Sequence, residues 1–342
     1  MKTLIALLLL AGVGFAQQPT TPPPDPAQQI RALQRRLESQ AQEIDVVQKQ
    51  ADDVLWHLKL ADVADVDKVR IASSKPIRMS NPTGQGAGNP LIIYAYVFTP
   101  KKLAGKAPML VFVHGGVHSS FVTTYAHIVR ELIDQGYVVV APEYRGSTGY
   151  GSEFYDQIDY GGAEIDDTHA VRDWAAQNLA QVDPQRVGIM GWSHGGYHTL
   201  MNIFRWPADY KVAYAGMPVS DLVMRMGYKG QGYRDTFAAF TGGKQAEADP
   251  VEYRRRSPVF YADKLQTPLL VHSNTNDEDV NVMEVEHLIA ALRAAGKKFE
   301  SKIYQNMPGG HSFNRLDTAA ARESRQEIYT FLAQHLHPAA AK

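Results

Sequence analysis

The sequence predicts an α/β fold in which a mainly parallel central sheet is flanked by helices. From about residue 66 onward, short apolar runs rich in β-branched residues alternate with longer segments of helical spacing. This order is typical of parallel strands joined by crossover helices. No repeat of about 40 to 50 residues is present in the sequence, so a β-propeller is not predicted within it.

The first residues predict export of the protein. Lys2 precedes an apolar run over residues 4–13, and small residues follow at Gly14 and Ala16. This pattern is typical of a signal peptide, here residues 1–16, and the expected location is secreted or periplasmic. The apolar run is too short to span a bilayer as a helix, so no membrane partner is expected. Residues 17–26 hold five prolines and predict an extended spacer.

Residues 27–64 carry a heptad pattern and are expected to be helical. Two sets of mainly apolar positions recur every seven residues: Ile30, Leu37, Ile44, Ala51 and Leu58, and Leu33, Gln40, Val47, Val54 and Ala61. A coiled coil that joins subunits into a homo-oligomer would explain the pattern. A long helix that packs on its own catalytic domain, residues 65–342, would explain it equally well. If the helix serves only to join subunits, residues 17–61 can be removed without loss of activity.

The strands and helices of residues 65–342 follow in alternating order. Strands are predicted over residues 91–98, 109–113, 137–141, 187–190, 212–215, 269–272 and 299–304. Helices are predicted over residues 124–134, 166–179, 195–204 and 282–294. Residues 205–265 contain five glycines and scattered aromatic residues, and we expect an irregular segment that borders the active site.

The motif Gly191-Trp192-Ser193-His194-Gly195 stands between a predicted strand and a predicted helix. This is the context of a nucleophile elbow, in which flanking glycines permit a tight turn that lifts the serine to the start of the helix. The motif predicts an α/β-hydrolase fold with Ser193 as the nucleophile. The backbone amide of His194 would then face the substrate as an oxyanion donor.

A serine nucleophile needs a base and an acid that orients the base. His311 comes after the last predicted strand and is preceded by two glycines, Gly309 and Gly310. A flexible loop could therefore bring its ring to the serine. Asp277 lies beyond the strand of residues 269–272, and the chain order serine, acid, histidine is that of α/β hydrolases. Asp279 lies in the same loop and remains the alternative acid.

Two further sets of residues are assigned to substrate. His114-Gly115-Gly116 follows the strand of residues 109–113, as expected of the loop that supplies a second oxyanion amide. Gly115 is the first choice for this donor and Gly116 the alternative. In the irregular segment, Tyr228, Tyr233, Phe237 and Phe240 could form an apolar substrate pocket, or they could simply belong to the core.

Several motifs together resemble the catalytic domains of prolyl oligopeptidase-like serine peptidases, in particular the acylaminoacyl peptidases. The similar segments are residues 114–121 (HGGVHSSF), 144–151 (YRGSTGYG), 182–197 with the elbow, and 253–258 (YRRRSP). The resemblance covers roughly residues 90–337. It implies a serine hydrolase acting on a short peptide or a small acyl ester. In the family the acid stands three residues before a valine, as Asp277 stands before Val280, although the spacing from His272 is one residue longer.

The resemblance leaves the substrate open. Members of the family usually carry an N-terminal β-propeller that screens substrates by size, and this sequence has a spacer and a helix in that place. A carboxylesterase of the same fold is therefore the alternative function. A non-catalytic scaffold that acts through its coiled coil is a remote second alternative, because the serine, histidine, acid and glycine loop are all present.

Composition and spacing exclude several other classes. The 35 basic and 36 acidic residues give a net charge of −1, so no nucleic-acid partner is expected. The absence of cysteine excludes disulfides and thiolate metal sites. No ligand cluster with metal spacing and no phosphate loop is apparent, so neither a metal nor a cofactor is expected. Asp166 and Asp167 are interpreted as caps at the start of a helix.

Overall fold

The computed structural model describes residues 25–79, 88–103 and 105–339. The chain divides into two compact units, residues 1–41 and residues 42–342, and helix α1 (Pro26–Leu60) runs from the first into the second. The predicted signal peptide, residues 1–16, and most of the predicted spacer lie outside the described residues. Within the described ranges, every helix is too short or too polar to cross a membrane.

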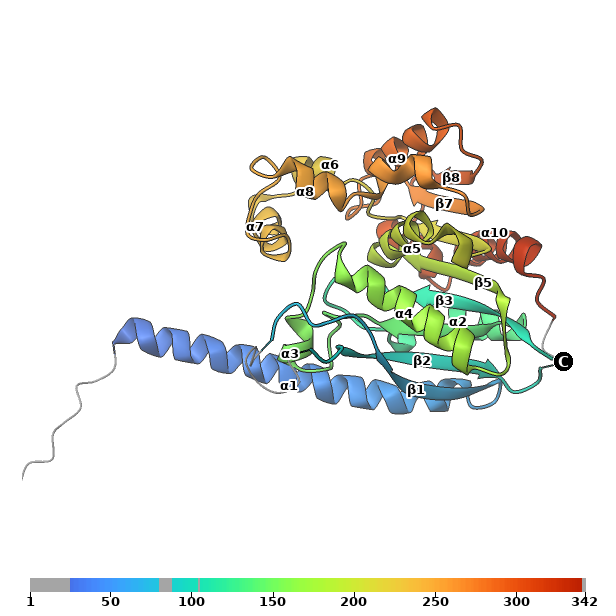
Figure 1. Ribbon diagram of the computed structural model, residues 1–342, viewed down its shortest axis with the longest axis horizontal. Coiled ribbons are helices and arrows are strands. Elements are labelled where there is room, and N and C mark those ends of the chain that lie inside the picture. The colour runs from blue at the N-terminus through green and yellow to red at the C-terminus, as the bar shows by residue number, and fades with distance from the viewer. Residues whose placement is uncertain (1–24, 80–87, 104, 340–342) are drawn as a thin grey trace, which may run out of the picture. The chain divides into compact units, whose positions relative to one another are not determined.

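The second unit is built on one sheet of eight strands (Figure 1). The strands are β1 (Ala64–Ala72), β2 (Ile92–Pro100), β3 (Ala107–Val113), β4 (Val138–Glu143), β5 (Val182–Trp192), β6 (Val212–Gly216), β7 (Leu269–Asn274) and β8 (Glu300–Tyr304). Their order in the sheet is β1-β2-β4-β3-β5-β6-β7-β8. The pairs β1 with β2 and β2 with β4 are antiparallel, and all others are parallel. The predicted mainly parallel sheet is therefore confirmed.

Helices cover both faces of this sheet. Alternate side chains of a strand point to opposite faces, and in β3 Val111 belongs to one buried apolar cluster while Leu110 and Phe112 belong to the other. The first cluster lies under α4 (Ala163–Asn178), α5 (His194–Arg205) and α9 (Val282–Ala294). The second lies under the end of α1, α2 (Ala126–Asp134) and α10 (Ala319–Leu336). Both faces are buried, so the central strands read as continuous apolar runs.

Residues 205–265 are more regular than the sequence suggested. They form helices α6 (Leu222–Tyr228), α7 (Gln231–Phe240) and α8 (Pro250–Arg255), with the 3-10 segments η2 (Pro207–Asp209) and η3 (Pro258–Lys264). The prediction of an irregular segment was wrong because these helices are too short to show a clear period. Asp221 and Asp249 cap two of them by accepting backbone N–H groups. In Figure 1 the three helices form a group beside the sheet.

The remaining elements are short or close the chain. Helix α3 (Ser152–Tyr155) and the 3-10 segments η1 (Thr123–Tyr125) and η4 (Gly310–Arg315) lie in loops that follow strands. Strand β1 and helix α10 had no counterpart in the sequence prediction. Strand β1 pairs on one side only and alternates buried with exposed positions. Its exposed polar residues interrupt the apolar run by which the other strands were predicted.

The end of α1 is an integral part of the second unit. Trp56 and Leu60 are fully buried, and the Trp56 ring stacks on Phe121 with centroids 5.4 Å apart. The Lys49 ammonium lies 2.6 Å from Glu143 Oε1 and donates a hydrogen bond of 2.6 Å to the Phe121 carbonyl. Removal of residues 17–61 would uncover this core, so these contacts argue against the expectation that activity survives that deletion. The second compact unit begins at residue 42 and so includes part of the predicted helical segment, residues 27–64.

The buried Lys49–Glu143 pair predicts a specific stability change. Lys49→Met leaves a buried carboxyl without its cation and is expected to lower the free energy of unfolding by about 3 kcal/mol or more. Lys68→Met is the control, because Lys68 pairs with Asp53 at 2.7 Å where both side chains are partly exposed, and it should cost less than about 1 kcal/mol. Urea unfolding measures both. Equal losses in the two variants would contradict the structural role of Lys49.

Candidate active site

Ser193 occupies a strained turn between β5 and α5. Its backbone has φ 59° and ψ −121°, in a region that non-glycine residues rarely adopt. A hydrogen bond of 2.8 Å from Ser193 N to the Gly216 carbonyl ties this turn to β6. The residue is 8% exposed, so only a small part of it reaches the surface. This is the geometry of the predicted nucleophile elbow.

The glycines of the elbow are required by close backbone contacts. A Cβ on Gly191 would lie 2.5 Å from the Gly195 backbone, and a Cβ on Gly195 would lie 2.2 Å from the Val113 carbonyl oxygen. Both separations are shorter than real side chains allow. The turn can therefore pack against β3 and against itself only because these two positions lack side chains.

His311 and Asp277 meet at the carboxyl edge of the sheet. Nδ1 of His311 lies 2.7 Å and 2.9 Å from the two carboxylate oxygens of Asp277. Asp277 is fully buried in its side chain, and its Oδ1 also accepts the backbone N–H groups of Asp279 and Val280. The carboxylate is thus held rigidly against one nitrogen of the ring, and Nε2 is left for another partner.

All three predicted catalytic residues lie at this same edge of the sheet. Parallel strands end at one edge of a sheet, and Ser193 follows β5, Asp277 follows β7 and His311 follows β8. In the part of the chain that the structure describes, the Ser193 hydroxyl forms no hydrogen bond. Hydrogen bonds between nucleophile and base are often long in sites without substrate and shorten when substrate binds.

Asp279 is differently placed from Asp277. Its carboxylate pairs with Arg225 at 3.1 Å and with Lys229 at 2.6 Å, and it is 43% exposed. Partial burial acts to raise the pKa of Asp279, but Arg225 and Lys229 outweigh it and the pKa is lowered. Its Oδ2 lies 3.8 Å from Nε2 of His311, on the side of the ring opposite Asp277. The geometry favours Asp277 as the residue that orients His311.

The predicted oxyanion loop lies directly against the elbow. A Cβ on Gly115 would lie 3.4 Å from the Ser193 Cβ and 3.0 Å from the Trp192 carbonyl oxygen. Gly116 has φ 73°, which favours glycine. Neither amide donates a hydrogen bond to any group among the described residues. His194 begins α5, where backbone N–H groups lack partners within the helix.

The segment after β4 packs against the predicted oxyanion loop. The Tyr144 hydroxyl donates to the Gly116 carbonyl at 2.6 Å, and the Tyr144 ring stacks on His114 with centroids 4.3 Å apart. The Ser147 hydroxyl lies 3.0 Å from Nε2 of His114. Burial lowers the pKa of His114 to about 3, so its ring is neutral. The two motifs of residues 114–121 and 144–151 therefore pack against each other.

The four aromatic residues assigned to a pocket do not share one environment. Phe237 is 2% exposed and packs on Tyr160 with ring centroids 4.6 Å apart, as a core residue would. The hydroxyls of Tyr228 and Tyr233 accept hydrogen bonds from Arg225, at 3.0 and 2.8 Å. Phe240 contacts His118, which follows the predicted oxyanion loop.

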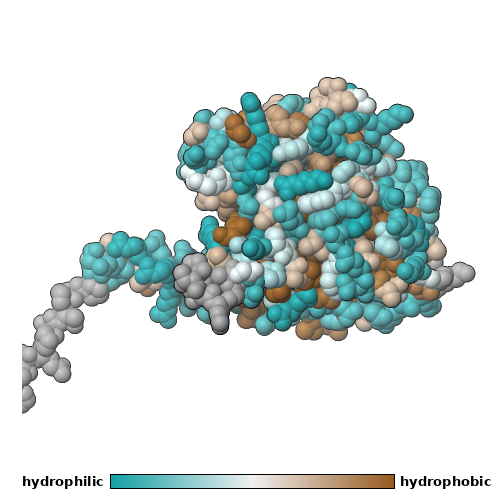
Figure 2. Space-filling model, in the orientation of Figure 1, coloured by the Kyte–Doolittle hydropathy of each residue, from teal (hydrophilic) through white to brown (hydrophobic). Residues whose placement is uncertain are grey.

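The contact between Phe240 and His118 links α7 to the segment that follows the predicted oxyanion loop. The Phe240 ring meets His118 edge-on, with centroids 5.4 Å apart. Figure 2 shows a notch in the molecular outline between the group of helices α6 to α8 and the body of the molecule, with hydrophobic atoms on its wall. A pocket formed by all four aromatic residues stays a prediction, and the contacts of Phe237 favour its alternative assignment to the core.

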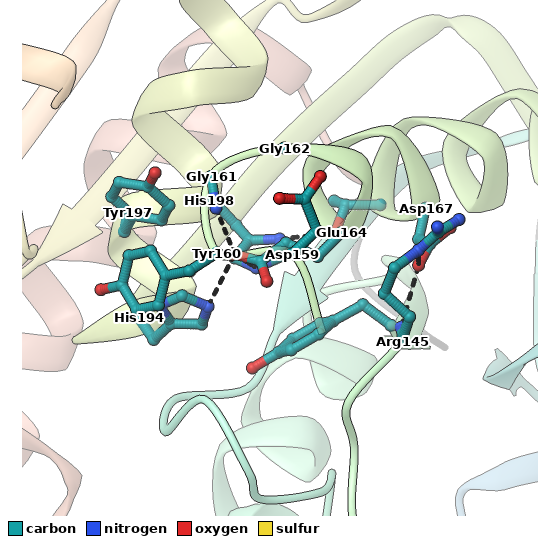
Figure 3. Close-up of polar contacts among 12 residues, drawn as sticks. Arg145, Asp159, Tyr160, Gly161, Gly162, Glu164, Asp167, His194, Tyr197 and His198 are labelled. Carbon is teal, nitrogen blue, oxygen red and sulfur yellow. Dashed lines mark hydrogen bonds and ion pairs between the residues drawn. The ribbon is translucent and has the colours of Figure 1, made fainter. Parts of the chain in front are cut away.

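One interpretation from the sequence was wrong. Asp167 is not a helix cap, because α4 begins at Ala163 and Asp167 lies within it. Asp166 lies in the first turn of α4, but the N-cap residue is Gly162. The buried Asp167 carboxylate forms a two-pronged ion pair with Arg145, with contacts of 2.7 and 2.8 Å (Figure 3). This pair anchors the segment after β4 to α4. Charge type alone could not distinguish a cap from a buried partner of Arg145.

The sequence analysis also missed a buried group of titratable residues beneath the elbow. Glu164 of α4 lies between His194 and His198 of α5 (Figure 3). The spacing of the two histidines by four residues places both on one face of a helix, a signal that could have been noticed. Glu164 is distant in sequence, and only the packing of α4 on α5 brings it there.

Comparisons with known proteins agree with this geometry. Residues 123–339 match the model of the prolyl oligopeptidase family. The uncharacterized peptidase YuxL of Bacillus subtilis is 31% identical over 255 residues, which cover 72% of this chain and 37% of that protein. The acylamino-acid-releasing enzyme of Arabidopsis thaliana is 26% identical over 250 residues, or 70% of this chain and 32% of that protein. The chain thus spans about a third of the length of these relatives.

Solved structures share the fold. The acylaminoacyl peptidase of Pyrococcus horikoshii superposes with a TM-score of 0.65 at 23% identity, covering 80% of this chain and 42% of that one. A puromycin-hydrolyzing peptidase of Mycobacterium tuberculosis gives 0.65 at 23% identity, covering 81% and 40%. The predicted α/β-hydrolase fold is confirmed. Because the family model matches more than half of its residues, the chain belongs to the prolyl oligopeptidase family.

Proposed function

We propose that the chain is a serine hydrolase of the prolyl oligopeptidase type, which cleaves peptide or ester bonds through an acyl-enzyme on Ser193. The observation that carries this proposal is the strained backbone of Ser193 at the start of α5, at the sheet edge where His311 is held by Asp277. Strain of this kind is retained where function requires it. A non-catalytic scaffold would have no need of this arrangement.

Acylation begins with attack of Ser193 Oγ on the carbonyl carbon of the substrate. Nε2 of His311 accepts the hydroxyl proton, and the buried Asp277 carboxylate stabilises the resulting imidazolium through Nδ1. The new C–O bond places a negative charge on the former carbonyl oxygen. The amides of His194 and Gly115, with Gly116 as the alternative, would donate hydrogen bonds to that oxygen.

The tetrahedral intermediate then collapses. The protonated His311 gives its proton to the leaving nitrogen or oxygen, the bond to that atom breaks, and the acyl group stays on Ser193. A water molecule attacks the acyl-enzyme, with His311 again accepting a proton. The bond between the acyl carbon and Ser193 Oγ then breaks, His311 returns the proton to Oγ, and the acid product leaves.

The resemblance and the relatives support a proposal for the substrate class. A short peptide is the preferred substrate, since acylamino-acid-releasing enzymes and dipeptidyl peptidases are among the similar proteins. A small acyl ester is the alternative, as a carboxylesterase of the same fold uses the same groups. An activated ester and an amide share the acylation step and differ only in the leaving group.

Matched substrates test this class directly. We expect hydrolysis of both the p-nitrophenyl ester and the p-nitroanilide of an N-blocked apolar amino acid. The ester should have the larger kcat, because its leaving group departs more readily. Permissive selection among apolar side chains is expected, since one methylene discriminates by only about 1 to 3 kcal/mol. Steady-state kinetics measure both, and ester turnover without any amide turnover would favour the carboxylesterase.

We also propose that the protein forms a homo-oligomer through α1. In residues 25–41 the apolar positions Ile30, Leu33 and Leu37 are exposed, and in residues 42–60 Ile44 and Leu58 are exposed too. These are positions of the predicted heptads, whereas the residues that pack on the catalytic unit belong to other positions. An apolar heptad stripe suits a second copy of the same helix.

Light scattering tests the oligomer. Leu37→Asp places a charge in the apolar stripe and is expected to lower the solution mass to that of the monomer. Arg31→Asp changes an exposed position outside the stripe and should leave the mass unchanged. Deletion of residues 1–41, which spares the packed end of α1, should act like Leu37→Asp. A wild-type protein that is monomeric at all concentrations would contradict the proposal.

A further inference from the structure

A buried group of three side chains lies directly beneath the elbow. Nε2 of His194 lies 3.1 Å from Glu164 Oε1, and Nε2 of His198 lies 3.7 Å from the same oxygen. All three side chains are at most 2% exposed. Figure 3 shows both imidazole rings, on α5, directed at the carboxylate on α4. One donor atom from each residue lies within 4.8 Å of the others.

Several polar atoms of this group lack hydrogen-bond partners. Among the described residues, Glu164 Oε2, Nδ1 of His194 and Nε2 of His198 form no hydrogen bond. Glu164 Oε1 accepts the Gly161 N–H at 2.9 Å and lies 3.1 Å from Nε2 of His194. No lysine or arginine in the described ranges pairs with Glu164. A buried polar atom without a partner costs about 1 to 3 kcal/mol, and an unpaired buried charge costs more. The Nε2 atoms of both histidines approach the same carboxylate oxygen, an arrangement that suits a cation placed between them.

A second group of acidic residues and a histidine differs from the buried group in its surroundings. His169, Asp173 and Asp209 also lie close together, but near the surface. Arg172 lies 2.8 Å from the Asp173 carboxylate and 3.8 Å from that of Asp209. That group already has its cation, and solvent reaches it.

We propose that Glu164, His194 and His198 bind one divalent transition-metal ion, with Zn²⁺ as the preferred metal. Two imidazoles and a carboxylate are a donor set that Zn²⁺ takes in proteins. Bonds of about 2.0 to 2.1 Å in a tetrahedral site place neighbouring donor atoms about 3.3 Å apart. The observed separations of 3.1 and 3.7 Å lie on either side of that value.

The surroundings suit a metal site. Nδ1 of His198 lies 2.8 Å from the Thr168 hydroxyl, which can accept its proton and leave a lone pair on Nε2. The unpartnered Glu164 Oε2 could supply a fourth donor atom if the carboxylate binds through both oxygens. The rings of Tyr144 and Tyr160 pack on the histidines, with centroids 4.3 Å from His198 and 4.5 Å from His194. They keep water from the site.

The bound ion would join α4 to α5 at the residue after the nucleophile. It would act as a structural link and would not contact substrate.

Metal content tests the proposal without any measurement of activity. The full chain, purified without metal-affinity steps from medium containing ZnCl₂, is analysed by mass spectrometry for bound metals. About one zinc ion per chain is expected. His198→Gln and Glu164→Gln should each lower the content at least tenfold. His169→Gln, in the group near the surface, should keep it.

Spectroscopy of the wild-type protein covers the case in which the variants do not fold. Refolding in CoCl₂ should give the visible absorption of tetrahedral Co²⁺, and X-ray absorption of the zinc protein should show imidazole ligands. A wild-type chain without zinc after growth and after refolding in ZnCl₂ would overturn the proposal and assign a shared proton to the site. A folded His198→Gln variant that keeps its zinc would overturn it as well. Neither result bears on Ser193 as nucleophile.

Discussion

Replacing Ser193 by alanine is expected to lower kcat for the matched ester by about 10⁴-fold or more, because no other group can form the acyl-enzyme. His311→Ala should cost a similar factor, since the members of a triad act as a unit and their losses are not additive. Both variants should keep the wild-type circular dichroism spectrum. Stopped-flow and steady-state assays on the ester measure the loss.

Ser273→Ala is the matched control. This residue lies in β7, is 1% exposed, and its hydroxyl has no hydrogen-bond partner among the described residues. Its loss removes a buried serine hydroxyl without touching the elbow, so kcat should change by less than about twofold, as is usual for substitutions that break no contact. A Ser193→Ala variant that retains turnover comparable to this control would end the nucleophile assignment.

Asp277→Asn is expected to lower kcat by about 10³ to 10⁴-fold, because an amide in this place favours the wrong tautomer of the histidine and cannot stabilise the imidazolium. The buried carboxylate touches Nδ1 of His311 through both oxygens. The effect should appear in kcat, with KM changed little, because Asp277 acts through His311 on the transition state.

Asp279→Asn provides the comparison and should cost less than about tenfold, since an interaction with a half-exposed charge is screened by solvent. Its carboxylate already pairs with Arg225 and Lys229. It lies near Nε2, the nitrogen that must receive the serine proton, so it cannot orient the ring in the required direction. A larger loss for Asp279→Asn than for Asp277→Asn would move the acid role to Asp279.

The elbow could be predicted from sequence because its causes are local. The two glycines, the strand before Ser193 and the helix after it lie within a few residues of one another. The same holds for α9, whose predicted residues 282–294 agree with the observed Val282–Ala294. Apolar strands buried on both faces were recognised for the same reason, since burial on both sides leaves an uninterrupted apolar run.

Features that depend on distant contacts could not be predicted. Lys49 reads as one polar residue of a heptad helix, and only the packing of α1 reveals that it is buried against Glu143. Asp167 reads as a cap until Arg145 is placed beside it. The oxyanion loop and the segment after β4 are each recognisable as motifs, but the hydrogen bonds that join them are tertiary.

The environment of the aromatic residues in α6 and α7 also depends on distant contacts and could not be predicted. Tyr233, Phe237 and Phe240 have no spacing that separates a pocket from a core. The buried Arg225, which no sequence argument singled out, determines the environment of Tyr228 and Tyr233. Its own contacts with Asp279 and Glu284 come from one distant stretch of the chain, residues 279–284.

The central claim is that Ser193 forms the covalent intermediate, and a fluorophosphonate adduct tests it most directly. The reagent is incubated with the full chain, the protein is digested, and the modified peptide is located by tandem mass spectrometry. We expect one adduct per chain, on Ser193, with loss of ester turnover in proportion to labelling and no adduct in His311→Ala on the same time scale. An adduct on a different residue, or full turnover in fully labelled protein, would contradict the account.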